Sequence, residues 1–308
     1  MIGVALRGVP VFLFMVWLAL IGGCARIPDT GKTLLTPRTF GELQGYLLAH
    51  KSDLEIFKLR GPFAVGEQSD FEIRLSTTEV IRSDLFLSAH KEKAPLVVFL
   101  HGYESSKENH RFQAMHLASW GMHGLALQLP NKGPWLANGT TLAKLIKFIH
   151  RWPEIVESRI DVSKIILVGH SFGGAAVAIA LADGAPAAGG ILLDPAVVEI
   201  DMSRYLRLIN VPVMLLGADE HVSMASNRDN FYRFIRAGIA EVSIRGAAHE
   251  DAQYPADTAQ ATEELQITFV SALTSAAFSL SATGKFDYAW AGFGAAFDKG
   301  KLFNAKKK

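Results

Sequence analysis

The sequence predicts an α/β fold in which a mostly parallel central sheet carries helices on both faces. Between residues 96 and 280, short apolar runs that are typical of buried strands alternate with longer segments of helical periodicity. Hydrophobic residues make up 49% of the 308 residues and charged residues 20%, so the chain is able to bury a sizeable core. No internal repeat or linker divides this region, and we expect a single domain over residues 51–308.

The first elements of this domain are expected to form one edge and the centre of the sheet. Short alternating pieces between residues 53 and 89 predict edge strands. The continuous apolar run 96–100 predicts a buried central strand, which leads into the turn His101-Gly102-Tyr103. A helix over 109–122 and a strand over 124–129 follow.

The segment 130–139 is rich in Pro, Gly and Asn and predicts a loop. Trp135 and Leu136 within it are candidate walls of a substrate pocket, although Trp135 is equally compatible with core packing. Helical periodicity over 140–152 stops at Pro153. The rest of the chain predicts strands at 165–168, 190–193, 212–216 and 241–244, the last of the sheet, and helices at 175–182, 228–237 and 256–279.

The C-terminal residues carry an aromatic stripe. Phe286, Trp290, Phe293 and Phe297 recur at helical spacing, and the chain ends in Lys306-Lys307-Lys308. We interpret the stripe as one face of a terminal helix that packs on the domain, with the lysines in solvent. The alternative is an interfacial helix that touches lipid.

Charge and cysteine content exclude several classes of function. A net charge of +1 provides no long-range field for nucleic acid, so we expect no nucleic-acid partner. Cys24 is the only cysteine, which excludes an intrachain disulfide and a thiolate zinc site. The ten histidines show no metal-binding spacing such as H-E-x-x-H. We therefore expect no metal and no cofactor.

The N-terminus predicts export. Arg7 provides a positive charge ahead of the uncharged apolar stretch 9–21, which is too short for a comfortable transmembrane helix. The following Ile21-Gly22-Gly23-Cys24 resembles the lipobox of bacterial lipoproteins. This resemblance implies a signal peptide over 1–23, lipidation of Cys24 and a lipid-anchored position in the bacterial cell envelope, with the outer membrane or periplasmic face favoured. An uncleaved N-terminal anchor is the alternative.

Residues 24–50 then form a tether and an N-terminal segment ahead of the domain. The part from Ala25 to Pro37 is polar and contains Pro and Gly, a composition typical of tethers.

The motif G-x-S-x-G directly follows one of the expected buried strands. The apolar run 165–168 leads into Gly169-His170-Ser171-Phe172-Gly173, and a run of small residues follows. In a strand-turn-helix context, this motif holds a nucleophilic serine in a strained bend. The N–H of Phe172 then lies at a helix N-terminus, where it is able to stabilise a developing negative charge.

Polar residues that could assist Ser171 follow other strands. They are Asp194, Asp219, Glu220, His249 and the His101-Gly102 turn. Since the carboxyl ends of parallel strands meet at one edge of a sheet, we expect these groups to converge there. A serine needs a base, and the base needs an orienting carboxylate. His249 is the only histidine after the final expected strand and is our candidate base, while the acid stays open between Asp194 and Asp219 or Glu220.

Three motifs together resemble the platelet-activating factor acetylhydrolase group of α/β-hydrolases. They are Gly169–Gly174, Leu192-Leu193-Asp194-Pro195 and Ile244–His249, and the strand 95–102 fits the same group. The resemblance covers about residues 80 to 300 and implies an α/β-hydrolase fold with Ser171, Asp194 and His249 as catalytic residues. The Leu-Asp-Pro strand end is also similar to chlorophyllases and to polyester-cleaving relatives of dienelactone hydrolase.

Two N–H groups are needed to hold the oxyanion of an acyl-transfer reaction. We expect them to come from Phe172 and, in the turn after the first buried strand, from Tyr103. The segment between Asp194 and Val211 is too short for a large cap domain, so we expect loops to cover the pocket.

These features favour a serine hydrolase that cleaves small-molecule or lipid esters with short or medium acyl groups. The acyl-enzyme would form on Ser171, and membrane contact would come through lipidated Cys24. Two alternatives remain: an acyltransferase that uses the same acyl-enzyme, and a catalytically silent envelope lipoprotein with a hydrolase fold.

Overall fold

The computed structural model describes residue 37 and residues 39–308, except 51–52, 199–200, 220–221, 257 and 260. The strands of this part are β1 (Val65–Arg74), β2 (Val80–Ser88), β3 (Ala94–Leu100), β4 (His123–Gln128), β5 (Ile160–His170), β6 (Gly189–Leu193), β7 (Val213–Ala218), β8 (Ile239–Ile244) and β9 (Leu302–Lys307). The α-helices are α1 (Phe40–Ala49), α2 (Leu54–Lys58), α3 (Arg111–Ser119), α4 (Trp135–Arg151), α5 (Phe172–Ala182), α6 (Met202–Leu206), α7 (Val222–Phe234), α8 (Glu263–Thr283) and α9 (Asp287–Asp298). Short 3₁₀ turns lie at Lys107–His110, Pro153–Ile155 and His249–Ala252.

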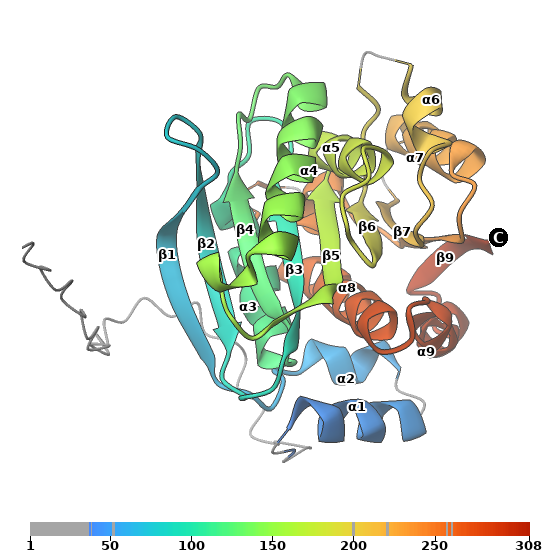
Figure 1. Ribbon diagram of the computed structural model, residues 1–308. Coiled ribbons are helices and arrows are strands. Elements are labelled where there is room, and N and C mark those ends of the chain that lie inside the picture. Colours follow the sequence, from blue (N-terminus) through green and yellow to red (C-terminus); the bar gives the residue numbers. More distant parts are fainter. Residues whose placement is uncertain are drawn as a thin grey trace, which may run out of the picture.

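The strands form one sheet in the order β1-β2-β4-β3-β5-β6-β7-β8-β9 (Figure 1). The six strands from β4 to β8 in this order run parallel to one another. The strands β1 and β2 on one side and β9 on the other are antiparallel to their neighbours. The predicted fold class, a mostly parallel sheet with helices on both faces, is confirmed.

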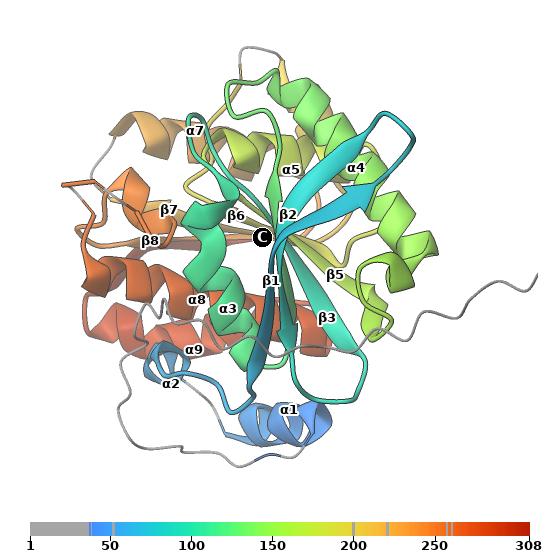
Figure 2. The ribbon, with the colours of Figure 1, turned by 90° about the vertical axis from the view of Figure 1, so that its left-hand side faces the viewer.

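Helices cover both faces of this sheet because its central strands are apolar on both sides. One core cluster joins one face to α1, α2, α3, α8 and α9. The other joins the opposite face to α4, α5, α6 and α7. Figure 2 shows these two layers, with α4 and α5 on one side of the strands and α8 and α9 on the other.

The helix α8 is the longest in the described chain and belongs to the core. Its length and mean hydropathy would allow it to cross a membrane, but 83% of its apolar window is buried inside the domain. Phe269, Leu273 and Phe278 are all fully covered. We therefore describe α8 as a core helix, and its role in the fold is to close one face of the sheet.

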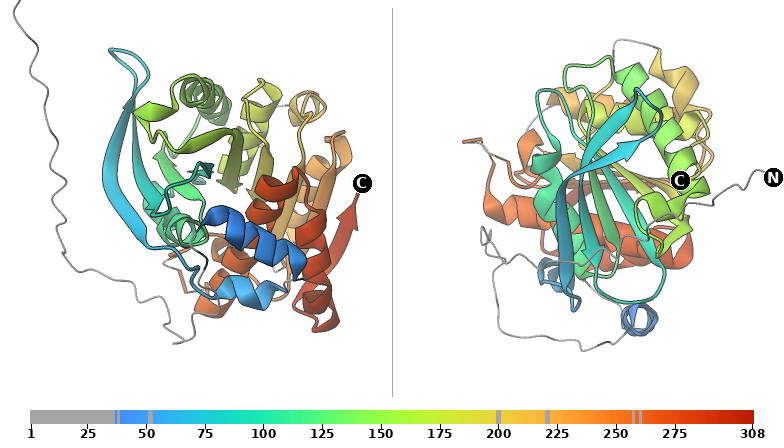
Figure 3. Two further views of the ribbon diagram at one scale, coloured as in Figure 1. Left: turned by 60° about the horizontal axis from the view of Figure 1, so that its bottom comes forward. Right: turned by 60° about the vertical axis from the view of Figure 1, so that its left-hand side comes forward.

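The N-terminal segment contains a helix that packs on the domain. Phe40, Leu43 and Leu47 of α1 are buried, and the ring of Phe40 stacks on His90 with 5.5 Å between centroids. The left view of Figure 3 shows α1 and α2 beside α8 and α9. The packed unit therefore includes α1, within the range that the sequence predicts as tether and N-terminal segment.

One expected strand is a helix. Residues 54–58 form α2, whereas the alternation of apolar residues from Asp53 onward predicts edge strands. The carboxylate of Asp53 accepts a hydrogen bond from the N–H of Glu55 and so caps the helix at 3.0 Å. Leu54 and Phe57, three residues apart, then bury one face, and Phe57 packs against Trp120. The expectation for this segment was wrong, while β1 and β2 lie where edge strands were expected.

The expected loop over 130–139 ends earlier than predicted. The helix α4 begins at Trp135, and the N–H of Asn138 closes its first turn on the carbonyl of Pro134 at 3.1 Å. The side chain of Asn138 donates to the carbonyl of Pro130 at 2.8 Å. The second half of the expected loop, residues 135–139, is thus the first part of a helix that begins after Pro134.

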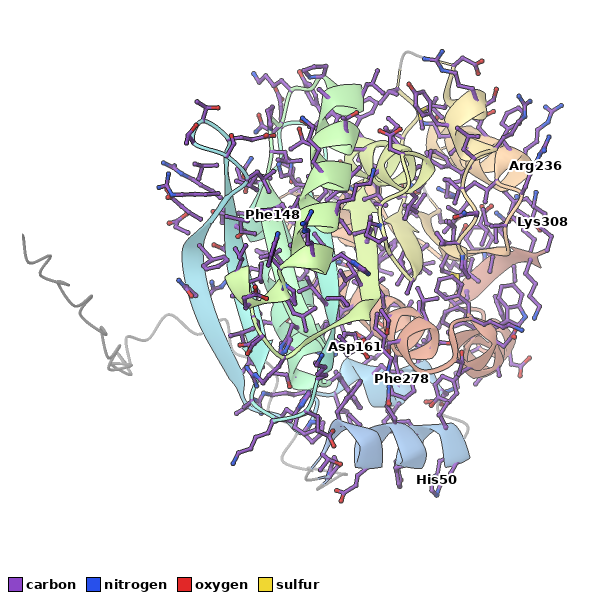
Figure 4. The ribbon with its side chains drawn as sticks, viewed as in Figure 1. His50, Phe148, Asp161, Arg236, Phe278 and Lys308 are labelled. Carbon is purple, nitrogen blue, oxygen red and sulfur yellow. The ribbon has the colours of Figure 1, made fainter. Side chains whose placement is uncertain are left out.

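The C-terminal residues form an edge strand that the sequence does not predict. The strand β9 pairs antiparallel with β8, which makes β9, rather than β8, the last strand. Its lysines are not simply solvated: Lys306 forms ion pairs with Asp229 at 2.7 Å and with Glu241 at 3.1 Å. Lys308, which is labelled in Figure 4, donates from Nζ to the carbonyl of Arg233 at 3.4 Å.

The aromatic stripe of α9 packs on the domain, as we favoured from the sequence. Phe293 is fully buried and Phe286 is 8% exposed. Tyr288, on the same helix, donates a hydrogen bond to the carbonyl of Leu47 in α1 at 2.9 Å. This stripe therefore joins α9 to the N-terminal helices.

Candidate active site

Ser171 lies in the tight turn between β5 and α5, with φ 55° and ψ −127°. A positive φ is uncommon for a non-glycine residue and is typical of strained functional turns. Two glycines make the turn possible. A Cβ on Gly169 would lie 2.4 Å from the carbonyl oxygen of Gly173, and a Cβ on Gly173 would lie 2.4 Å from that of His101. The turn is therefore closed around Ser171 on both sides.

Asp194 and His249 come together at the same edge of the sheet. The Nδ1 atom of His249 lies 2.6 Å from Oδ2 of Asp194. Asp194 follows β6 directly, has φ 40° and is fully buried, while the His249 side chain is 18% exposed. The turn at Ser171 is tied to the same strand end, because its N–H donates to the carbonyl of Leu193 at 3.0 Å. With Nδ1 engaged, Nε2 is the ring nitrogen of His249 that is left to act as a base.

The other carboxylate oxygen of Asp194 is also occupied. Oδ1 accepts a hydrogen bond from the N–H of Ala218 at 3.0 Å and an ion-paired one from Nη1 of Arg228. Arg228 comes from α7 and is 2% exposed. Both oxygens of this buried carboxylate thus have partners, which fixes its orientation toward His249.

Asp219, the second candidate acid, has different partners. Its carboxylate accepts a hydrogen bond from the N–H of Gly246 at 3.1 Å, and its own N–H donates to Ala247 at 2.9 Å. It ties the end of β7 to the turn after β8, and among the described residues it forms no hydrogen bond or ion pair with His249. Glu220, the remaining candidate, lies outside the described residues.

His170, which precedes Ser171 in the motif, contacts His249. Its Nε2 donates a hydrogen bond to the carbonyl of His249 at 3.0 Å, and the two rings are 4.5 Å apart. Burial holds the pKa of His170 well below its usual range, so the ring is neutral at pH 7. His101 is likewise buried, which lowers its pKa; its Nδ1 donates to the carbonyl of Gly102 at 2.9 Å, and its Nε2 accepts a hydrogen bond from the N–H of Leu129 at 3.3 Å.

The turn after β3 lies directly against Ser171. A Cβ on Gly102 would lie 2.8 Å from the Cβ of Ser171, so only glycine leaves room for this approach. The next residue, Tyr103, is 50% exposed, and its ring lies edge-on to that of Phe172 at 6.4 Å. Within the described chain, the N–H groups of Tyr103 and Phe172 have no hydrogen-bond partner. Both are therefore available to an oxygen beside Ser171.

Trp135 borders this site. Its indole stacks on the ring of Phe172 with centroids 5.6 Å apart, and it is 8% exposed. Leu136, the next residue of α4, is 36% exposed. Trp135 is therefore part of both the core and the site, because it packs against Phe172, the residue after Ser171.

Residues 97–296 match the model of the alpha/beta hydrolase family. The chain belongs to the alpha/beta hydrolase family. The match spans from β3 to α9 and so includes the turn at Ser171 and the segments that carry Asp194 and His249. No curated protein matches the sequence. Family membership supports a hydrolase-type activity, and in alpha/beta hydrolases a G-x-S-x-G turn carries the nucleophile.

Two charged residues near the site were not singled out from the sequence. Arg228 contacts Asp194, and Glu241 of β8 lies 3.4 Å from Nε of Arg228. Arg228 is one of three charged residues of α7, with Asp229 and Arg233, and no motif marks it. Within the described chain, no group of three or more His, Cys, Asp or Glu side chains is placed to hold a metal ion.

Proposed function

We propose that this alpha/beta hydrolase cleaves carboxylic esters through an acyl-enzyme on Ser171, with His249 as base and Asp194 as acid. The observation that carries the proposal is the 2.6 Å contact between His249 Nδ1 and Asp194 Oδ2. It occurs at the strand edge where Ser171 occupies a strained turn. A serine, a histidine and a buried carboxylate in these roles form the arrangement that activates a hydroxyl near neutral pH.

In the proposed mechanism, these residues carry out the first half of the reaction as follows. The Oγ of Ser171 attacks the ester carbonyl carbon while Nε2 of His249 removes the hydroxyl proton. The carbonyl oxygen becomes an oxyanion that accepts hydrogen bonds from the N–H groups of Phe172 and Tyr103, each worth about 3 kcal/mol of barrier. The tetrahedral intermediate collapses, and His249 gives its proton to the departing alcohol. Ser171 is left as an acyl ester.

In the second half, water replaces the alcohol. His249 takes a proton from the water as it attacks the acyl carbon, and the second tetrahedral intermediate expels Oγ of Ser171. The proton returns to Oγ, and the carboxylic acid leaves. Asp194 stays ionised throughout, because its task is to orient His249 and to stabilise the imidazolium form.

The proposed substrates are esters with short or medium acyl groups, including phospholipid esters with a short acyl chain. This part of the proposal depends on the resemblance to the platelet-activating factor acetylhydrolase group. A second support is the segment between β6 and β7, in which α6, a five-residue helix, is the described helical element. A segment of this size is too small for a cap domain, so the approach to Ser171 depends on side chains such as Tyr103 and Trp135.

A fluorophosphonate probe tests the proposed nucleophile. We expect the probe to label the wild type and expect Ser171→Ala to lose both labelling and turnover of p-nitrophenyl esters. Ser163→Ala is the matched control, because Ser163 is an exposed residue near the start of the same strand. Full labelling of folded Ser171→Ala protein would refute the assignment.

A substrate series tests the proposed acyl preference. Purified protein is compared on acyl esters of increasing chain length and on phospholipids with a short second acyl chain. A steep loss of kcat/KM beyond short acyl groups supports the acetylhydrolase-like proposal. A preference for long chains would contradict it and indicate a lipase.

We also propose that Cys24 is the lipidated N-terminus of a mature protein that is anchored in the bacterial cell envelope. The support is in the sequence alone: Arg7, the apolar stretch 9–21 and the Ile21-Gly22-Gly23-Cys24 sequence. Residues 1–23 and Cys24 lie outside the described residues. Lipid attachment would hold the enzyme at a membrane surface, because two or more acyl chains keep a protein bound where a single chain lets it exchange.

A further inference from the structure

A chain of buried charges extends from Asp194 to the C-terminal edge of the sheet. Arg228 pairs with Asp194 through Nη1, and its Nε lies 3.4 Å from Oε1 of Glu241. Asp194, Arg228 and Glu241 are 0%, 2% and 1% exposed. The Nη2 atom of Arg228 also lies 3.4 Å from the hydroxyl of Ser243. The guanidinium is therefore shared between two carboxylates in a site that solvent does not enter.

The strand β9 completes this chain. The side-chain amide of Asn304 donates to Oε1 of Glu241 at 3.1 Å, and Nζ of Lys306 lies 3.1 Å from Oε2. The backbone of β7 is shaped to receive Arg228, because a Cβ on Gly217 would lie 2.4 Å from its Nε. Residues at the end of β6, in β7 and in β8 thus surround Arg228, while β9 contacts Glu241.

The arrangement has an energetic reason. A carboxylate that is removed from water needs a positive partner and filled hydrogen-bond positions. Arg228 provides these for Asp194, but an unshared guanidinium would also weaken the attraction of Asp194 for a protonated His249. Glu241 opposes this effect, because its negative charge partly neutralises the same guanidinium. Burial raises the pKa of Glu241, while Lys306 and Arg228 act in the opposite direction and favour its ionised form.

We infer that Arg228 is a positioning residue for Asp194, and that Glu241, held by β9, sets how much of the Arg228 charge acts on Asp194. This inference depends on the proposed function, since it assigns Asp194 as the acid. Arg228 acts on the reaction through Asp194 and His249, without touching the substrate. Its loss therefore affects the transition state more than substrate binding.

The first experiment separates charge from geometry at position 228. We expect Arg228→Met to lower kcat about 100-fold with little change in KM, which is the cost of a displaced catalytic group. Arg228→Lys keeps the positive charge but loses the several N–H donors of the guanidinium. Its kcat should therefore lie between those of the wild type and Arg228→Met. Arg159→Met is the matched control. Arg159 also forms an ion pair, with Glu157 at 2.9 Å, but it lies just before the start of β5, whereas Ser171 follows the end of that strand.

The second experiment uses the pH profile of kcat/KM, whose acidic limb reports protonation of the base. Removing the positive charge in Arg228→Met strengthens the hold of Asp194 on a protonated His249, so the acidic limb moves to higher pH. Glu241→Gln leaves the Arg228 charge to Asp194 alone, so the limb moves to lower pH. We expect each displacement to be about half a pH unit or more.

The other groups around this network keep the same charge in both variants. His170, which faces His249, is held neutral by burial, and Lys306 stays paired with Asp229. A general loss of stability would lower the folded fraction without moving the acidic limb in opposite directions. The pH profile therefore distinguishes positioning from a purely structural role.

The outcomes are decisive in either direction. Opposite displacements of the acidic limb, with the Arg159→Met control unchanged, support the inference. Unchanged profiles and rates in folded variants overturn it. If Arg228→Met does not fold, a lowered kcat in Arg228→Lys together with an acidic limb at lower pH in Glu241→Gln supports the inference, and unchanged values in both variants overturn it.

Failure of the proposed function is visible separately. A folded wild type without probe labelling or ester turnover contradicts the proposed function. In that case, an NMR titration of the His249 ring in the wild type and in Glu241→Gln tests the network without any substrate. A midpoint that is lower in Glu241→Gln supports the network, and equal midpoints overturn it.

Discussion

Three buried histidines predict that the domain loses stability in mild acid. Burial lowers the pKa of His110, His116 and His123 from 6.5 to about 4 in each case. An unfolded chain would bind protons at these positions from about pH 6.5 downward, whereas the folded chain binds them only near pH 4. The folded state therefore holds fewer protons in this window, and its stability falls as the pH falls.

The magnitude follows from the displacement of each pKa. A displacement of about 2.5 units corresponds to about 3 kcal/mol per histidine when the loss is complete below pH 4. At pH 5 the loss relative to pH 7.5 is about 2 kcal/mol for each group, or about 6 kcal/mol for the three together. Domains are stable by only about 5–15 kcal/mol, so this loss is large enough to bring the protein close to unfolding.

Urea unfolding at pH 7.5 and pH 5, followed by tryptophan fluorescence, measures the effect. His116→Gln should reduce the pH dependence of the unfolding free energy by about 2 kcal/mol. The glutamine amide is still able to donate to the carbonyl of Phe57, the partner of His116 at 2.8 Å. His150→Gln is the control, since His150 is exposed on α4. A wild-type free energy that changes by less than about 2 kcal/mol between the two pH values would refute the reasoning.

Two further predictions concern the acid and the N-terminus. Asp194→Asn should lower kcat about 10⁴-fold because His249 loses its orienting carboxylate. Asp219→Asn should cost less than about tenfold, because Asp219 bonds to the N–H of Gly246 instead, and steady-state kinetics of the two variants would reveal a reversed ranking. Cys24→Ser should abolish lipid attachment and normal processing but leave esterase activity intact. Mass spectrometry of the mature N-terminus decides this, and cleavage elsewhere or an unmodified cysteine would reject the lipoprotein proposal.

The central sheet could be predicted because its strands carry their own signal. The apolar runs 96–100 and 165–168 are buried on both faces and have few alternatives to a central parallel strand. The strand β9 lacks this signal, since half of its six residues are polar, and it forms by pairing with the edge of β8. The helix α2 was misread because five residues are too few to separate helical spacing from alternation.

The site could be predicted in part for a geometric reason. Parallel strands deliver the residues that follow them to one edge, so Ser171, Asp194 and Asp219 were expected to be neighbours. Order along the chain does not separate Asp194 from Asp219, because both follow adjacent strands. The separation depends on which carboxylate is turned toward His249, and that is a property of the folded turns. Arg228 could not be found, because a contact between a helix face and a distant strand end leaves no local pattern.

The position of α1 determines how the domain is presented if Cys24 is the anchor. The ring of Phe40 stacks on His90. The same ring also fills the space beside Gly121, just before β4 begins. The helix α1 is therefore attached where the parallel strands begin, while the turn between β5 and α5, which holds Ser171, lies where they end (Figure 1). If Cys24 is the anchor, the chain reaches the domain on the side opposite the reactive edge. Ester substrates from the surrounding aqueous space or from a facing surface would then reach Ser171 without passing the side of the domain to which the anchor connects.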